Sequence, residues 1–264
     1  MTRNLDYIEH LTRESARFGA ALRDAAPDAR VPTCPDWDAD DLLWHLGHVQ
    51  WWWATIVRDG VTGDEAEQRK PERPTDREKL FEFQADAGRE LIRVLAERPP
   101  DSPTWTWGQP PGTTAFVRRR QAHEAFVHRL DAELTAGNRT AMDTQLASDG
   151  VDETLRVMYS YLPSWGTFTP EPAKTVRMTT TDTDATWLVT LGRFTGTDDE
   201  GTAHDEPDLQ VAAEDPGGPV AAECRGEAVD LLCWLVQRPA LGDVVRTGDQ
   251  LVLEHLYAAV APGV

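Results

Sequence analysis

The sequence predicts a mixed fold (α + α/β mixed), in which an N-terminal four-helix bundle precedes a small α+β C-terminal domain. Apolar residues recur at steps of three and four through roughly the first 160 residues, which is helical spacing. Beyond about residue 170 they alternate, which is typical of strands. The chain has 264 residues, of which 40% are hydrophobic, so it can form one or two domains with buried cores. We predict domains at residues 1–165 and 166–264.

The first half contains long segments with the spacing of an amphipathic helix. Their ranges are 4–25, 38–58, 75–97 and 114–136. We expect Asp38 or Asp40 to cap the second helix and Thr75 to cap the third. We expect loops at residues 27–36 and 60–74, and therefore no strand before about residue 140. Four helices of about 20 residues, joined by loops of about 12 to 17 residues, favour a four-helix bundle.

A fifth helix is expected over residues 148–162, ending before Pro163. Short alternating or apolar runs then predict strands at 175–181, 186–194, 209–213 and 220–224. Residues 196–207 contain few apolar side chains, and we expect this segment to be mobile. Helical spacing returns at 227–237 and again after Asp249 up to residue 260. The second half is therefore predicted to combine a sheet with helices.

Charge and composition exclude several classes of function. The chain has 26 basic and 45 acidic residues and a net charge of −19, so nucleic acids and anionic membranes would be repelled. The most apolar early run, residues 42–57, is too short to span a bilayer. Three cysteines, Cys34, Cys224 and Cys233, cannot form a disulfide framework. The first 13 residues do not resemble a leader, so we expect a cytoplasmic protein with no nucleic-acid or membrane partner.

Histidine and glutamate side chains on two expected helices form a candidate metal site. Glu124 and His128 are four residues apart, so they lie about 40° apart on one helix face. His45 lies among apolar residues of the second helix, which indicates that it points inward. His123 lies about 140° from His128 around the helix and cannot share a metal with it. Two histidines and one carboxylate are a ligand set of open zinc and related divalent sites. Spacing alone also allows a core histidine and a surface Glu–His pair.

Neighbouring residues leave alternatives open. We interpret His48, one turn beyond His45, as a core residue, although it can also be a proton shuttle or a fourth ligand that closes the site. Asp131 lies on the same face as His128 and can either orient its imidazole or pair with an arginine. The tryptophans at 51–53 circle their helix, so at least one ring should be exposed or line a cleft. Core packing is the main expectation for the others.

Separated motifs resemble the mycothiol-dependent maleylpyruvate isomerase-like family. Residues 34–46 read CPDWDADDLLWHL, similar to the family pattern CPxW…DLxxHL. Residues 119–133 read RRQAHEAFVHRLDAE, similar to the second pattern E…HRxDAExAxG. Residues 148–153 and 226–238 resemble the start of the family's fifth helix and the closing helix of its small C-terminal domain. The motifs recur in order across both expected domains.

The resemblance implies a DinB-like metal-binding helical bundle in which His45, Glu124 and His128 bind a divalent metal, typically zinc. It also implies that mycothiol, a small sugar thiol, is the cosubstrate at the open coordination position. Zinc promotes loss of the thiol proton, and the thiolate then adds to an electrophilic small molecule. Addition to a cis alkene such as maleylpyruvate, followed by bond rotation and loss of the thiol, is isomerisation. A persistent adduct would make the protein a thiol S-transferase.

The resemblance further implies a catalytic arginine late in the C-terminal domain, and Arg238 is its positional match. A guanidinium pairs well with a substrate carboxylate. Arg238 follows Gln237, where the family commonly has glycine, and it can instead be a cation at a helix C-terminus. The alternative function is a non-catalytic metal or small-ligand binding protein with the same bundle.

Overall fold

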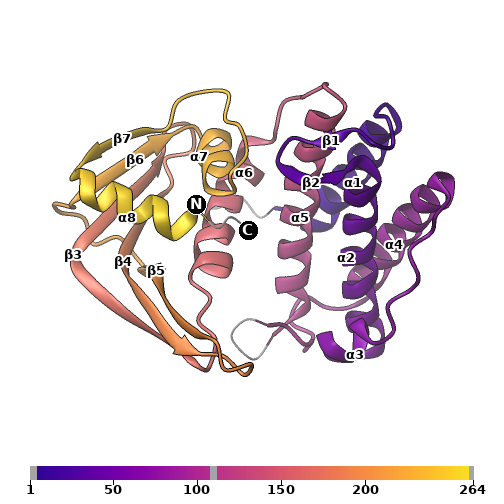
Figure 1. The fold of residues 1–264 in the computed structure, drawn as a ribbon, viewed down its shortest axis with the longest axis horizontal. Helices are drawn as coiled ribbons and strands as arrows, with labels where there is room; N and C mark the ends of the chain where they lie inside the picture. Colours follow the sequence, from indigo (N-terminus) through magenta and orange to yellow (C-terminus); the bar gives the residue numbers. More distant parts are fainter. Residues whose placement is uncertain (1–4, 108–111, 262–264) are drawn as a thin grey trace. The chain divides into compact units, whose positions relative to one another are not determined.

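The computed structural model describes residues 5–107 and 112–261 of the chain. The chain divides into two compact units, Met1–Ala141 and Met142–Val264. The first is helical, and the second contains a sheet with helices (Figure 1). This arrangement confirms the predicted fold class. In the described residues, no helix combines the length and the apolar composition that crossing a membrane requires.

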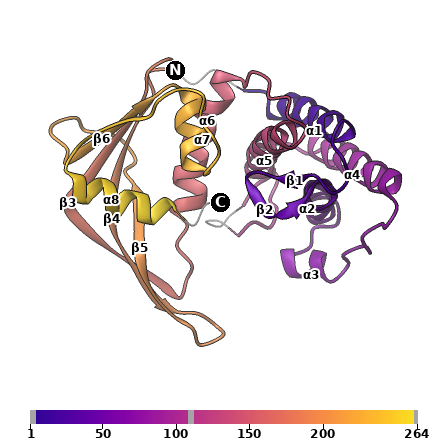
Figure 2. The same ribbon diagram turned by 45° about the horizontal axis from the view of Figure 1, so that its top comes forward.

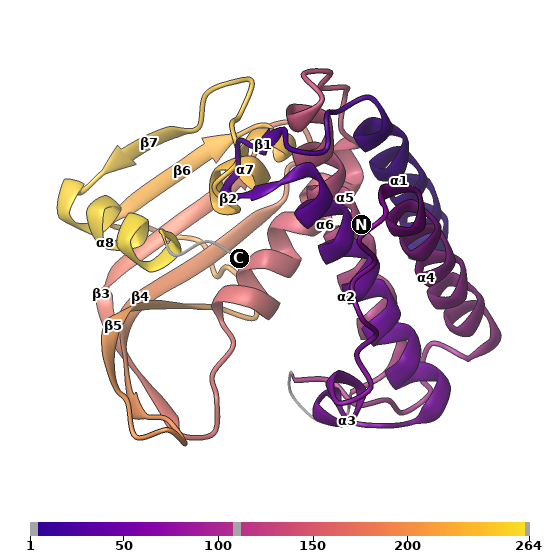
Figure 3. The same cartoon turned by 45° about the vertical axis from the view of Figure 1, so that its right-hand side comes forward.

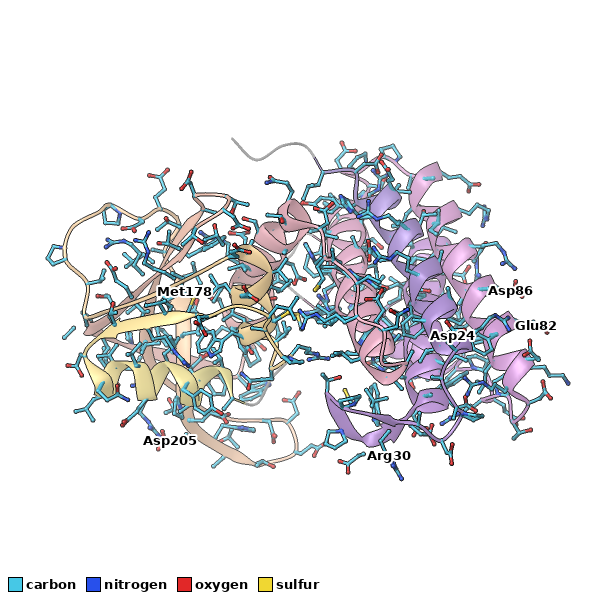
Figure 4. The ribbon with its side chains drawn as sticks, turned by 90° about the horizontal axis from the view of Figure 1, so that it is seen from above. Asp24, Arg30, Glu82, Asp86, Met178 and Asp205 are labelled. Carbon is cyan, nitrogen blue, oxygen red and sulfur yellow. The ribbon has the colours of Figure 1, made fainter. Side chains whose placement is uncertain are left out.

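The first unit is a bundle of long helices. They are α1 (Tyr7–Arg23), α2 (Ala39–Asp59), α4 (Arg77–Glu97) and α5 (Thr114–Thr135). Helix α1 packs against α5 and α4, and α2 packs against α4 and α5, as Figure 2 shows. The apolar stripes predicted from spacing form the core, with Leu11, Phe18 and Leu91 fully buried. The predicted four-helix bundle is therefore present, and its charged outer faces carry exposed Glu82 and Asp86 (Figure 4).

Carboxylates begin the helices α2 and α4. The Asp38 side chain accepts a hydrogen bond from the Asp41 amide at 2.8 Å, and Asp41 accepts one from the Asp38 amide at 3.1 Å. This capping box confirms Asp38 as the N-cap. The prediction of Thr75 for α4 was wrong by one residue, because the Asp76 carboxylate caps the helix by accepting from the Lys79 amide. A carboxylate is a strong acceptor at the positive end of a helix.

Two segments expected to be loops contain regular structure. Residues 27–36 overlap a small hairpin of β1 (Arg30–Val31) and β2 (Cys34–Asp38), so the prediction of no strand before residue 140 was wrong. Residues 60–74 contain the short helix α3 (Gly63–Glu67). Such short elements have too few residues to show an apolar period, which is why spacing missed them.

The second unit begins with α6 (Thr144–Glu153), which continues as the π-helix η1 (Thr154–Tyr159). Its sheet has the strand order β5–β4–β3–β6–β7 within residues 142–261. Strands β3, β4 and β5 form an antiparallel meander, β6 runs parallel to β3, and β7 is antiparallel to β6. The bounds are β3 (Gly166–Thr180), β4 (Thr186–Thr197), β5 (Ala203–Val211), β6 (Ala222–Gly226) and β7 (Val245–Gly248). Helices α7 (Ala228–Leu235) and α8 (Gln250–Val260) complete it.

The strands are longer and more numerous than predicted. Residues 196–207, expected to be mobile, form the end of β4, a turn and the start of β5, because backbone pairing needs no apolar side chains. Strand β7 was missed because all four of its residues are exposed and show no alternation. The predicted buried strand positions are correct, since Met178, Val189 and Leu209 are fully buried. Figure 4 labels Met178 within this unit.

The compact units divide at residues 141 and 142, earlier than the predicted domain boundary at 165 and 166. The fifth helix, α6 with η1, groups with the second unit because it packs against α7. It is also attached to the sheet, since the Trp187 indole donates to Asp152 at 2.8 Å. The boundary at 165 and 166 stays a prediction about independently folding domains.

Candidate metal centre

The structure brings together the side chains of His45, Glu124 and His128. His45 lies on α2, and the other two lie one turn apart on α5. One ligand atom from each residue lies within 4.8 Å of the other two. The Nε2 atoms of His45 and His128 lie 3.3 and 3.2 Å from the same oxygen, Oε1 of Glu124. The three side chains therefore point at a common centre, as helix spacing and the family motifs predicted.

Neighbouring residues fix the orientation of the His128 and His45 rings. The Nδ1 atom of His128 lies 2.9 Å from Oδ2 of Asp131, which leaves Nε2 directed at the centre. Asp131 is fully buried, and its other oxygen accepts a hydrogen bond from Thr33 at 2.7 Å. The His45 ring lies 4.7 Å from the Trp37 ring, measured between centroids. Of the two roles left open for Asp131, the structure shows the imidazole contact.

Arg120 anchors the glutamate. Its guanidinium donates to Oε2 of Glu124, one helical turn away, and Oε1 remains directed at the two histidines. Burial by itself would raise the pKa of Glu124, but Arg120 and the hydrogen bonds with His128 and His45 hold that pKa well below its usual range. Glu124 is therefore an ionised carboxylate at neutral pH, which is the form that binds a metal ion.

Burial and two carboxylates oppose each other at His128. Burial by itself would lower its pKa, but Asp131 and Glu124 outweigh it and raise the pKa of His128 to about 9. His45 is more accessible, with 31% of its side chain exposed against 10% for His128. One side of the centre is therefore open, while the α5 side is closed.

Sequence reasoning missed Arg120 and Thr33 in this site. Arg120 is detectable, because it lies four residues before Glu124 and such pairs meet on one helix face. Thr33 has no local signal, since it lies between the two short strands of the hairpin that was expected to be a loop.

Comparison with known families identifies this unit. Residues 8–133 match the model of the mycothiol maleylpyruvate isomerase N-terminal domain. This range contains all three candidate ligands and the helices α1 to α5, except the first residue of α1 and the last two residues of α5. The N-terminal unit belongs to this domain family. No curated protein matches the sequence.

Solved structures of a mycothiol-dependent maleylpyruvate isomerase have a similar fold. One match covers 92% of this chain and 93% of that chain, with a TM-score of 0.60 and 8% identity. That structure is of a histidine-to-alanine mutant. A second structure of such an isomerase has the same coverage and identity and a TM-score of 0.59. At this identity the likeness concerns the fold, and it includes both units.

Two further histidines lie apart from the candidate ligands. His48 stacks between Trp44 and Trp51, with ring centroids 5.6 and 5.9 Å away, and its Nε2 lies 3.4 Å from Glu67. His123 is 2% exposed and packs its ring edge-on against Tyr7. Neither belongs to the metal-compatible group found among the described residues. Nearby, Trp53 is buried in the core with Trp105 and Trp107, as expected for packing tryptophans.

Arg238 lies in the second unit, directly after α7. Its amide donates to the carbonyl of Cys233 at 2.7 Å, and its guanidinium donates to the carbonyl of Val236 at 2.6 Å. The preceding residue, Gln237, has a φ of 57°, in the left-handed region that favours glycine. The family pattern commonly has glycine at this position, and the backbone here has the conformation that glycine adopts most easily.

Proposed function

We propose that this protein is a metal-dependent enzyme that activates the thiol of mycothiol for attack on an electrophilic small molecule. The reaction is either cis–trans isomerisation of a maleylpyruvate-like acid or thiol S-transfer. One observation carries the proposal: two imidazole nitrogens and one carboxylate oxygen converge within 4.8 Å in a unit that matches this family's N-terminal domain.

The donor set fits a divalent metal such as zinc. Neutral imidazole and ionised carboxylate are preferred zinc ligands, and three protein donors are typical of catalytic rather than structural sites. When bound, zinc lowers the pKa of a coordinated thiol and so supplies the nucleophilic thiolate at neutral pH. His45, Glu124 and His128 are the residues that would hold the ion.

The surrounding residues fix these donors before anything binds. Because Nδ1 of His128 contacts Asp131, Nε2 is the nitrogen left for an ion once its proton is displaced, and Thr33 fixes Asp131. Arg120 occupies the second oxygen of Glu124, so that Oε1 is the oxygen left for the ion. Because these contacts exist already, little conformational entropy is lost on metal binding.

We propose in addition that Arg238 binds the carboxylate of the substrate. Its planar guanidinium can pair with two oxygens at once. The left-handed backbone of Gln237 supports the match to the glycine–arginine pattern of the family. An Arg238→Lys variant should raise KM for a carboxylated electrophile at least about tenfold, because bidentate pairing is lost. Its metal content should not change.

The proposal is tested with purified protein whose metal content is measured first. Metal-loaded protein is then incubated with mycothiol and maleylpyruvate, and mass spectrometry and chromatography follow the trans isomer and any thiol conjugate. A cobalt-substituted sample should gain a sulfur-to-metal absorption band when mycothiol is added. The result that would contradict the proposal is a metal-loaded protein that gives no product, no conjugate and no band. Metal binding in such a protein would favour the non-catalytic alternative.

A further inference from the structure

A cavity of about 420 Å³ lies between α1 and α4, the two helices that Figure 3 shows side by side. Its walls are mostly small residues, including Ala16 and Gly19 from α1 and Ala85 and Gly88 from α4. Its volume is in the range of sites that hold small organic molecules. None of the candidate metal ligands lines it, so it is a separate feature of the first unit.

The side-chain amide of Gln84 lines this cavity. Gln84 is only 4% exposed, and within residues 5–107 and 112–261 its side chain has no hydrogen-bond partner. A Cβ at Gly19 would lie 3.0 Å from Oε1 of Gln84, and a Cβ at Gly88 would lie 3.9 Å from Nε2. The Gln84 amide therefore lies close to two glycines, and the missing side chain of Gly19 is what lets Oε1 approach α1 this closely.

A second amide lies behind Gly88. Gln50 is fully buried, and its Nε2 donates to Ser15 at 2.7 Å. Its Oε1 has no partner among the described residues and would be 2.9 Å from a Cβ at Gly88. Gln50 does not line the cavity, so the amide that faces the cavity without a partner is that of Gln84. Most amides of buried residues are hydrogen-bonded, so the Gln84 amide indicates a site for a polar ligand group.

We propose that this cavity binds a small, neutral, planar molecule with a lactam or imide edge. An edge with adjacent N–H and C=O groups matches the Gln84 amide, because Nε2 donates to the ligand carbonyl while Oε1 accepts from the ligand N–H. The glycine and alanine walls admit a flat ring. Arg23 and Arg89 line the cavity but pair with Glu78 and Asp86, which favours a ligand without charge.

The experiment measures binding of 2-quinolone, a planar bicyclic lactam, to the full chain by NMR of the glutamine side-chain amides. N-methyl-2-quinolone is the matched probe, since it lacks the N–H group. We expect Gln84→Leu to weaken 2-quinolone binding at least about tenfold, because both hydrogen bonds are lost. Ala85→Leu should do the same by filling the space between the helices. The control is Gln68→Leu, which changes an exposed glutamine outside the cavity.

Several results would overturn the proposal. One is that 2-quinolone fails to shift the Gln84 amide signal at millimolar concentration. Another is equal affinity for the wild type and Gln84→Leu, or for the two quinolones. Dimerisation that Ala85→Leu abolishes, seen by sedimentation without any quinolone binding, would assign the cavity to a helix of a second copy. Circular dichroism of each variant shows whether it is folded, and metal content, measured in parallel, is independent of these outcomes.

Discussion

Helix α5 carries two clusters of buried charged residues, and their charges are compensated in different ways. One cluster contains Glu124, His128 and Asp131, and the other contains Arg129 and Glu133. The members alternate along the helix, so the clusters lie on different faces of the same turns. Comparing them shows what distinguishes a candidate metal site from a structural ion-pair cluster.

In the cluster of Arg129 and Glu133, the structural cluster, the central cation is a side chain of the protein itself. Arg129 is fully buried and donates to Glu14 at 2.9 Å and to Glu133 at 2.8 Å. Burial by itself would raise the pKa of Glu133, but hydrogen bonds from Thr140 and the charge of Arg129 lower it. The negative charges of this cluster surround a guanidinium.

In the cluster of Glu124, His128 and Asp131, which His45 joins from α2, the metal-binding atoms face one another and Arg120 lies on the far side of Glu124. Arg120 takes the rear oxygen of Glu124, while Oε1 and the two imidazole Nε2 atoms face one another. Burial alone would lower the pKa of His128, but Asp131 and Glu124 raise it to about 9, so this imidazole carries a proton at neutral pH in the metal-free protein. The difference shows that the position of the cation, and not the number of charged residues, marks a site for an external ion.

The largest expected effect is on metal content. Replacing His128 with Ala removes one of three donors, so we expect loss of essentially all the roughly one divalent ion per chain. The loss should also lower the thermal midpoint of metal-loaded protein, because a ligand that binds only the folded state stabilises it. Elemental analysis measures the ion. The matched control, His48→Ala, should keep it. Full occupancy in His128→Ala would show that the ligand assignment is wrong.

The second prediction concerns the structural cluster. Replacing Arg129 with Met leaves buried carboxylates without their central cation and should lower the free energy of unfolding by about 3 kcal/mol. This is the lower end for a broken buried pair, since Arg13 and Arg17 also reach Glu14. Denaturant unfolding measures the change. Arg89→Met, at an exposed ion pair, should change it by less than about 0.5 kcal/mol. Equal effects of the two substitutions on the free energy of unfolding would contradict the idea that the buried Arg129 cluster stabilises the fold more than an exposed ion pair does.

The third prediction tests whether Asp131 positions the metal ligand. Asp131→Asn should weaken zinc binding about 10- to 100-fold, because the imidazole loses its carboxylate partner. Thr33→Val removes only the bond that fixes Asp131 and should weaken zinc binding less, about fivefold. Competition with a chelator measures both. If Asp131→Asn changes the unfolding midpoint of the metal-free protein but leaves zinc affinity unchanged, then Asp131 has a structural role alone.

The clusters also show how far sequence reasoning extends. Glu124 and His128 are recognisable because helix periodicity fixes their common face. The inward direction of His45 follows from its apolar neighbours and made it the candidate third ligand, and the family motifs gave the same set. Asp131 had two chemically equal choices, and its contact with the His128 imidazole depends on packing that spacing does not give. Thr33 depends on a hairpin too short to have a pattern.

The second unit provides a third kind of carboxylate, the half-buried Asp208 on β5. Burial raises the pKa of Asp208 to about 6, and the hydrogen bond from the Leu209 amide offsets only part of this effect. Nearby Glu206 raises the pKa further. On the same strand, exposed Asp205 pairs with Arg193 at 2.6 Å (Figure 4 labels Asp205). Asp208 therefore ionises at a cost that Glu124 and Glu133, whose pKa values are lowered, do not have.

The smallest expected effect follows from this cost and depends on pH. The unfolded chain ionises Asp208 near pH 3.8, whereas the folded chain does so near 6. The folded state therefore binds the proton more tightly, and its stability falls as the pH rises from about 4 to 6. Asp208→Asn removes this titration while keeping an acceptor for the Leu209 amide. It should be neutral at pH 4 and stabilise the second unit by about 1–2 kcal/mol above pH 6. Thermal midpoints measured at several pH values test this, with Asp205→Asn as the control that should show no gain. A gain that is the same at pH 4 and pH 7.5 would mean that the effect of Asn is not electrostatic.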